Sequence, residues 1–186
     1  MNNLLKKTFA LLLFVWSMPA LHAQNYNIEL PRYFEIDDAA TWTSEFLTFE
    51  EPIEGFRMTV FATNTSDTYN GFPVVALAEV DITDTNGDEV TYTATTNSLA
   101  KNAGNGPAGL FDNSTAEDSY YHSAYNGNVA ISPDEPVYIE FRFDKPQKAF
   151  KYKLVACNDR KDFPIHYTLS LLGEKGKKPF NPIRPA

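Results

Sequence analysis

Few side chains in this sequence could carry out catalysis. Of the three histidines, His22 lies in the N-terminal leader, and neither His122 nor His166 belongs to a zinc spacing such as His-x-x-x-His. The sequence also lacks a Gly-x-Ser-x-Gly motif, a phosphate-binding glycine loop and a Cys-x-x-Cys pair. Carboxylates are numerous, but no sequence rule selects two of them as an acid–base pair. The sequence therefore favours a protein that is not an enzyme.

The single cysteine, Cys157, indicates how the fold is stabilised. One cysteine cannot form an internal disulfide, so stability must come from the hydrophobic core. Cys157 follows the apolar residues 154–156, a context that favours a buried, inert thiol over a reactive one.

Residues 1–23 have the features of a cleavable secretory signal peptide. Two lysines precede an apolar run at 9–16, and Ala23 offers a cleavage site. The run is too short to span a membrane, so we expect an exported protein without a membrane anchor. The remainder fits one domain at 24–173, followed by a basic, proline-rich tail at 174–186.

The charge of the chain excludes two classes of partner. The formal net charge is −8, and it becomes more negative when Lys6 and Lys7 are removed with the leader. Such a charge repels nucleic acid and anionic membranes, so we expect neither as a partner.

Alternating apolar and polar residues predict β-strands throughout the domain. In residues 137–144, Val137, Ile139, Phe141 and Phe143 share one face, as expected of a half-buried strand. The same alternation recurs at 56–62, 150–156 and 165–171. The Asn-Gly pair within 84–88 predicts a hairpin turn between strands at 80–82 and 90–92.

One stretch of sequence is echoed in the second half of the chain. Residues 49–58 reappear in similar form as 143–152, and both are expected to read strand, proline turn, strand around Pro52 and Pro146. Chance similarity of two hairpins is the alternative. Neither half has enough strands to stand alone, so we expect the two halves to pack as one antiparallel β-sandwich.

Residues 110–123, LFDNSTAEDSYYHS, resemble the signature of discoidin-like, or coagulation factor type C, domains. That signature reads apolar-x-Asp-Gly-(Asp/Asn), followed by an aromatic residue and Ser; Asn113 takes the place of the glycine and can also adopt positive φ. Further segments are similar to strands and polar loops of the family, at 138–146, 152–160, 163–167, 55–60 and 76–80. The last two resemble strands that normally close such a domain, so the resemblance implies a permuted strand order.

The resemblance implies a galactose-binding-like jelly roll, whose relatives in secreted bacterial proteins bind glycans through loops at one end. Sugars need aromatic faces for their CH groups and directed polar groups for their hydroxyls. The residues expected to supply these are Tyr120, Tyr121, His122, Tyr125, Asn158, Asp159 and Arg160. Strand packing is the alternative role for the tyrosines, and a surface hydrogen bond or ion pair is the alternative for His122 and Arg160.

The resemblance also implies a structural calcium ion as the one cofactor to consider. Calcium is bound by oxygen ligands, and the side chains nominated for it are Glu79, Asp112, Glu117 and Asp118. The alternative is an acidic loop that holds no ion, in which Asp112 only forms a turn.

We therefore expect a noncatalytic carbohydrate-binding module of a bacterium, secreted or periplasmic, with a polysaccharide or glycoprotein as its partner. The alternative is a protein-interaction or adhesin module of the same fold, which a flat exposed patch of tyrosines would favour. A hydrolase would instead require a cleft with two facing carboxylates of raised pKa.

Overall fold

The computed structural model of the protein describes residues 25–29, 41–100, 105–114, 119–125, 129–131 and 135–173. The predicted leader at 1–23, the tail at 174–186 and the nominated Glu117 and Asp118 lie outside these residues. Within the described part of the chain, no helix is long and apolar enough to cross a membrane.

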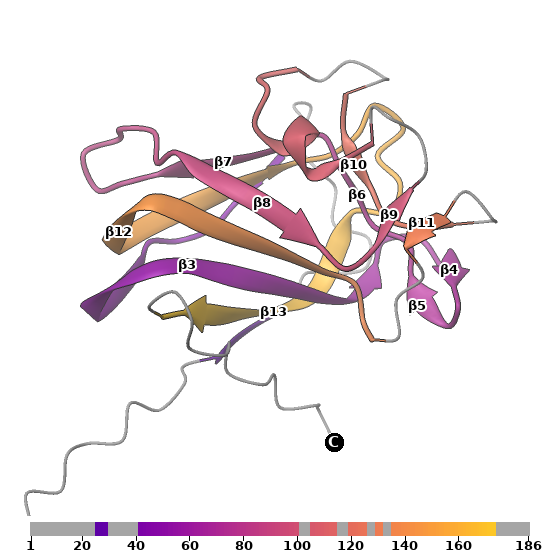
Figure 1. Ribbon diagram of the computed structural model, residues 1–186, viewed down its shortest axis with the longest axis horizontal. Helices are drawn as coiled ribbons and strands as arrows, with labels where there is room; N and C mark the ends of the chain where they lie inside the picture. The colour runs from indigo at the N-terminus through magenta and orange to yellow at the C-terminus, as the bar shows by residue number, and fades with distance from the viewer. Residues whose placement is uncertain are drawn as a thin grey trace, which may run out of the picture.

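Antiparallel strands make up nearly all of the regular structure (Figure 1). The large sheet contains β1 (Asn25–Glu29), β2 (Thr41–Thr43), β3 (Leu47–Thr63), β7 (Glu79–Thr83), β8 (Tyr92–Thr96), β12 (Tyr138–Val155) and β13 (Pro164–Leu172). The smaller elements are β4 (Thr68–Tyr69), β5 (Phe72–Pro73), β6 (Ala76–Leu77), β9 (Leu99–Ala100), the 3-10 helix η1 (Pro107–Leu110), β10 (Tyr121–His122) and β11 (Val129–Ile131). These short strands gather at one end of the large sheet, on the right in Figure 1.

The large sheet curls because its two longest strands each have different neighbours along their length. The sheet follows the order β1-β13-β3-β12-β2, while β8 pairs with the first half of β12 and β7 with its second half. The predicted all-β, antiparallel sandwich is confirmed. The jelly-roll strand order implied by the resemblance stays a prediction.

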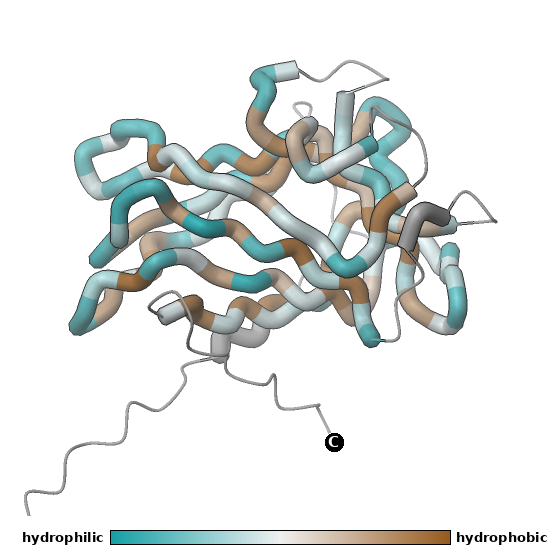
Figure 2. Tube along the Cα trace, in the orientation of Figure 1, coloured by the Kyte–Doolittle hydropathy of each residue, from teal (hydrophilic) through white to brown (hydrophobic). Residues whose placement is uncertain are grey.

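The predicted alternation of the strands is confirmed by burial. Buried and partly exposed side chains alternate along β12, and hydrophobic and hydrophilic residues alternate along β3 and β12 in Figure 2. The apolar side chains of β3 and β12 meet inside the curled sheet, where the Phe56 ring stacks on Phe141 at 4.7 Å and on Phe150 at 5.3 Å. The predicted hairpin also forms: Gly87 has φ +87°, and the Asp84 nitrogen donates to the Asp88 carbonyl at 2.9 Å.

The predicted proline turns are wrong. Pro52 lies within the continuous strand β3 and Pro146 within β12. The β3–β12 register shifts at both places, so each proline belongs to an irregular stretch of a long strand. Proline has no N–H group to donate, and an irregularity in the ladder is where a strand tolerates it.

The register explains the echo between the two halves. Phe56 pairs with Phe141, and Leu47 pairs with Phe150. Residues 56 and 150 are 94 positions apart, and so are residues 47 and 141. A local twofold axis between the two strands therefore places the pair Phe56–Phe141 on the pair Phe150–Leu47. The flanking strands follow the same relation, since Val60 of β3 pairs with β13 and Leu154 of β12 pairs with β7. The pairing of the flanking strands thus agrees with the expected common plan of the two halves.

Candidate functional site

A cavity of about 670 Å³ is lined by residues of the short strands β4, β6 and β10 and of the loops beside them. It is lined by parts of three segments that are distant in sequence, namely residues 67–78, 120–125 and 157–162. Its volume falls within the range of known ligand pockets, roughly 300–1,000 Å³. A hollow of this size at loops and strand ends is the strongest candidate binding site in the described part of the chain.

Five of the seven residues predicted to bind a glycan line this cavity: Tyr120, His122, Tyr125, Asn158 and Asp159. The three rings contact one another in a row. The His122 ring centroid lies 6.0 Å from that of Tyr120 and 4.5 Å from that of Tyr125. The structure thus brings the aromatic row and the polar residues Asn158 and Asp159 together in one cavity, although about 35 residues of sequence separate them.

Tyr121 does not belong to the site, which corrects the sequence-based expectation. It is fully buried in the core, and its hydroxyl donates to the Ser98 carbonyl at 2.8 Å. Successive side chains of a strand point to opposite faces. Tyr120 and His122 face the cavity, so Tyr121 between them must face the core.

Arg160 is the other predicted residue that does not line the cavity. It lies in the loop between Asp159 and Lys161, where its carbonyl accepts a hydrogen bond from the Asn64 side chain at 2.6 Å. Through this bond Asn64, which directly follows β3, ties the loop at 158–162 to the end of that strand.

Small residues make room for the cavity beneath the aromatic row. Ala76, Ala78, Val155 and Cys157 form a small buried cluster, and Tyr120 packs against it. The neighbouring 3-10 helix also packs closely against the backbone of Tyr120, since a Cβ atom on Gly109 would come within 2.9 Å of the Tyr120 backbone nitrogen. Larger residues at these places would fill the cavity or displace Tyr120.

The hydrogen bonds of His122 leave one ring nitrogen for a ligand. Its backbone nitrogen donates to the Asn105 carbonyl at 3.1 Å, and its Nδ1 lies 2.7 Å from the Ser123 carbonyl oxygen. A carbonyl can only accept, so Nδ1 carries the hydrogen and Nε2 of the neutral ring is an acceptor. Nε2 can therefore accept a hydrogen bond from a hydroxyl group in the cavity.

Sequence reasoning missed three charged residues of the cavity: Asp67, Lys161 and Asp162. Asp162 is buried, and its carboxylate accepts a hydrogen bond from the Thr65 hydroxyl. Burial raises the pKa of Asp162, and the Asp67 and Asp159 carboxylates raise it further. Asp67 lies far from the loop in sequence, so no local motif could have pointed to it.

The polar loop has a constrained backbone. Arg160 and Asp162 have positive φ values of 55° and 59°, a conformation that is rare for residues other than glycine. Such conformations cluster at ligand-binding sites, because the surrounding structure must hold them in place. The loop is thus built to present Asp159 and its neighbours in a defined geometry.

Cys157 lines the cavity but should react slowly with thiol reagents. Burial, with a contribution from Asp159 and Asp162, raises the pKa of the thiol from 9.0 to about 12. The thiolate is the reactive form, so we expect labelling in the folded protein to be at least about 100-fold slower than in urea-unfolded protein. Colorimetric thiol titration at pH 8 checks this, and equal rates in both states would contradict it.

Glu79 and Asp112, two of the residues nominated for calcium, lie together at the start of β7. The Ser114 backbone nitrogen donates to both carboxylates, at 2.8 Å and 2.9 Å. Burial, together with the nearby Asp112, raises the pKa of Glu79 from 4.5 to about 7. Asn113 has the expected positive φ, 58°.

The fit of these residues to a calcium ion is incomplete in the described part of the chain. Across those residues, no group of three or more histidine, cysteine or acidic side chains could hold a metal. Glu79 and Asp112 supply two carboxylates, whereas calcium takes six to eight oxygen ligands. Calcium binding stays a prediction.

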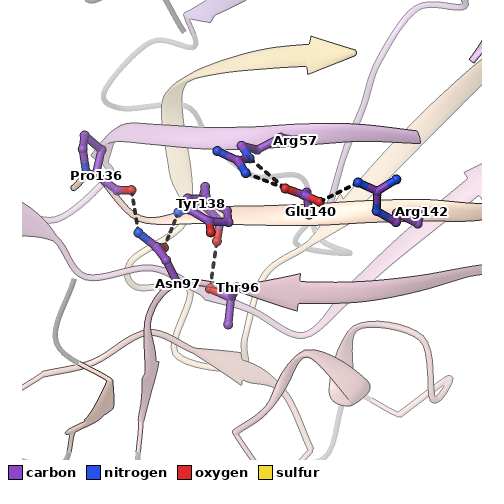
Figure 3. A network of polar contacts seen from close by, with 7 residues as sticks. All are labelled: Arg57, Thr96, Asn97, Pro136, Tyr138, Glu140 and Arg142. Carbon is purple, nitrogen blue, oxygen red and sulfur yellow. Dashed lines mark hydrogen bonds and ion pairs between the residues drawn. The ribbon is translucent and has the colours of Figure 1, made fainter. Parts of the chain in front are cut away.

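A second polar cluster, on the outer face of the sheet, has a structural role (Figure 3). Both oxygens of Glu140 are paired, one with Arg57 at 2.6 Å and the other with Arg142 at 3.2 Å. Asn97, which follows β8, links the end of that strand to the start of β12. Its side-chain oxygen accepts a hydrogen bond from the Tyr138 backbone nitrogen at 2.9 Å. Since both oxygens of the Glu140 carboxylate are already paired with arginines, the cluster is not a candidate site.

Comparison with known proteins gives no identification. No protein-family model matches the chain, and no curated protein sequence matches it.

Proposed function

We propose that this protein is an exported, noncatalytic carbohydrate-binding module and that the 670 Å³ cavity is its glycan site. The observation that carries the proposal is the aromatic row of Tyr120, His122 and Tyr125 beside the polar residues Asn158 and Asp159. Ring faces pack on the CH groups of a sugar, while carboxylate, amide and imidazole groups bind its hydroxyls. The discoidin-like resemblance of residues 110–123 agrees with this proposal.

A second hollow supports binding of a chain rather than a single sugar. It has a volume of about 250 Å³, and Asp67 and Thr68 line both hollows. Phe61, Pro73 and Ile165 give it an apolar part. A glycan that occupies the cavity can therefore extend past Asp67 and Thr68 onto this second surface.

Replacing Tyr125 by alanine is expected to weaken glycan binding strongly. The substitution removes one ring of the aromatic row and weakens the contact with a sugar by about 1–3 kcal/mol, a loss of roughly 5- to 150-fold in affinity. A glycan array with the wild type and Tyr125→Ala, run with calcium and again with chelator, provides the measurement. Phe46→Ala is the matched control, because Phe46 is exposed and does not line the cavity. Absence of binding to every glycan in both conditions would overturn the proposal.

A glycoside hydrolase is the second candidate function, favoured by Asp162. This carboxyl group has a raised pKa and lies in a cavity with Asp67 and Asp159. Glycosidases use two carboxyl groups, one of which acts as an acid. Release of reducing ends from a bound oligosaccharide, lost in Asp162→Asn, would replace the noncatalytic proposal by this one.

A protein-interaction or adhesin role has less support. The tyrosines of the site line a cavity instead of forming a flat patch. Among the described residues, the exposed large hydrophobic side chains are Phe46 and Phe111, which lie on separate segments.

A further inference from the structure

We propose that the cavity selects glycans that carry a free amino group, such as polymers with unacetylated amino sugars. This inference rests on the proposed function and names its ligand class. Its basis is the pairing, in one cavity, of an aromatic row with an excess of carboxylates.

The charge of the cavity favours a cation. Its described lining residues include three carboxylates and one lysine, namely Asp67, Asp159, Asp162 and Lys161. Asp67 and Asp159 both lie close enough to Asp162 to raise its pKa. A concave site lined by charges of one sign concentrates ligands of the opposite sign. An anionic sugar is disfavoured, and a neutral sugar gains nothing from this charge.

The aromatic row suits an ammonium group as well as a sugar ring. Tyr120 and Tyr125 each present a π-system, and cations bind to aromatic faces within about 6 Å of the ring centre. Asp159 lines the same cavity as this row, and its charge contributes to the raised pKa of the Tyr120 hydroxyl. An amino group placed between them would contact a ring face and form a charge-assisted hydrogen bond to Asp159.

Asp159 is the carboxylate best placed to recognise the amine. Asp162 is buried, and its carboxylate already accepts a hydrogen bond from the Thr65 hydroxyl, so it is less accessible to a ligand than Asp159. Asp159 is exposed, and one of its oxygens accepts a hydrogen bond from the Lys161 backbone nitrogen at 3.2 Å. That bond orients the carboxylate while its second oxygen can bind a ligand. An asparagine at this position keeps an acceptor for Lys161 and removes only the charge.

Three trimers with the same β-1,4 backbone test the inference by isothermal titration calorimetry. We expect the fully deacetylated glucosamine trimer, at a pH where its amines are charged, to bind at least 10-fold more tightly than the N-acetylated trimer or the glucose trimer. The advantage should shrink in 0.5 M salt, as an interaction between charges in an open cavity does. Asp159→Asn should remove most of the preference, measured as the ratio of the affinity for the glucosamine trimer to the affinity for the glucose trimer. Asp144→Asn, an exposed carboxylate outside the cavity, should change neither.

The outcomes separate this inference from the proposed function. Equal affinity for the three trimers would overturn the amine preference and leave glycan binding in place. Binding of no trimer, together with a negative glycan array, would overturn both. A lysine-containing peptide that binds in an Asp159-dependent manner while the glucosamine trimer does not would show an amine site for protein ligands, which also overturns the inference. A preference for the glucosamine trimer that Asp159→Asn leaves intact would show that Asp159 does not recognise the amine.

Discussion

Gly55→Ala is expected to destabilise the protein by about 3–5 kcal/mol, which lowers its melting temperature by roughly 10 °C or more. Gly55 lies in β3 opposite Arg142, next to the place where the β3–β12 register shifts. Its φ is +153°, and a Cβ atom there would come within 2.0 Å of the Phe141 carbonyl oxygen. The clash is with the backbone of the neighbouring strand, so no rotation of a side chain can relieve it. Thermal unfolding followed by circular dichroism gives the measurement.

Gly71→Ala is the matched control for this prediction. Gly71 also has a positive φ, +80°, but a Cβ atom there would meet nothing within 4 Å. The control therefore measures the cost of the backbone conformation alone, about 1 kcal/mol. If Gly55→Ala cost no more than Gly71→Ala, the close approach of β3 and β12 at this position would be disproved.

Glu79→Gln is expected to stabilise the protein above pH 7 by up to about 3 kcal/mol and to have little effect near pH 4.5. Burial, with the help of Asp112, raises the pKa of Glu79 from 4.5 to about 7. The folded protein therefore holds this proton more tightly than the unfolded chain, and stability is lost as the pH rises from about 4.5 to 7. Glutamine stays neutral, and its amide can still accept from the Ser114 nitrogen and donate to Asp112. Urea unfolding of both proteins between pH 4.5 and 8.5 measures the difference.

Asp81→Asn provides the control for Glu79→Gln. Asp81 lies two residues further along β7, but 41% of its side chain is exposed, and it pairs with Lys153 on the surface. Removal of its charge should change stability by less than about 1 kcal/mol at any pH. A stability difference between wild type and Glu79→Gln that does not change with pH would contradict the raised pKa of Glu79.

The same experiment examines the predicted calcium ion. A cation bound by Glu79 and Asp112 would neutralise their repulsion above pH 7. Added calcium should then raise the melting temperature of the wild type at pH 8 and leave that of Glu79→Gln nearly unchanged. An equal response of both proteins, or none, would show that these carboxylates do not form a calcium site.

The strand content of the fold could be predicted because alternation is a local property. Val137, Ile139, Phe141 and Phe143 occupy alternate positions, and any strand buried on one face requires that pattern. The hairpin at 84–88 was predictable for the same reason, since its Asn-Gly pair suits the turn whatever lies around it.

The paths of β3 and β12 could not be predicted in the same way. Pro52 and Pro146 are strong turn signals, yet both lie inside continuous strands. Each proline lies where the ladder between the two strands is irregular, and the local sequence holds no information about that partner strand. The propensity for a turn was overridden by pairing between halves of the chain.

The candidate site shows the same division. Composition and local motifs determined that the chain is acidic, rich in strands and poor in catalytic groups, and they marked the segments at 120–125 and 158–160. Only the tertiary structure decided that Tyr121 faces the core and that Asp67 and Asp162 join the cavity. The physical reason is that side-chain direction follows from strand register, and the grouping of charges follows from which loops the curled sheet brings to one end.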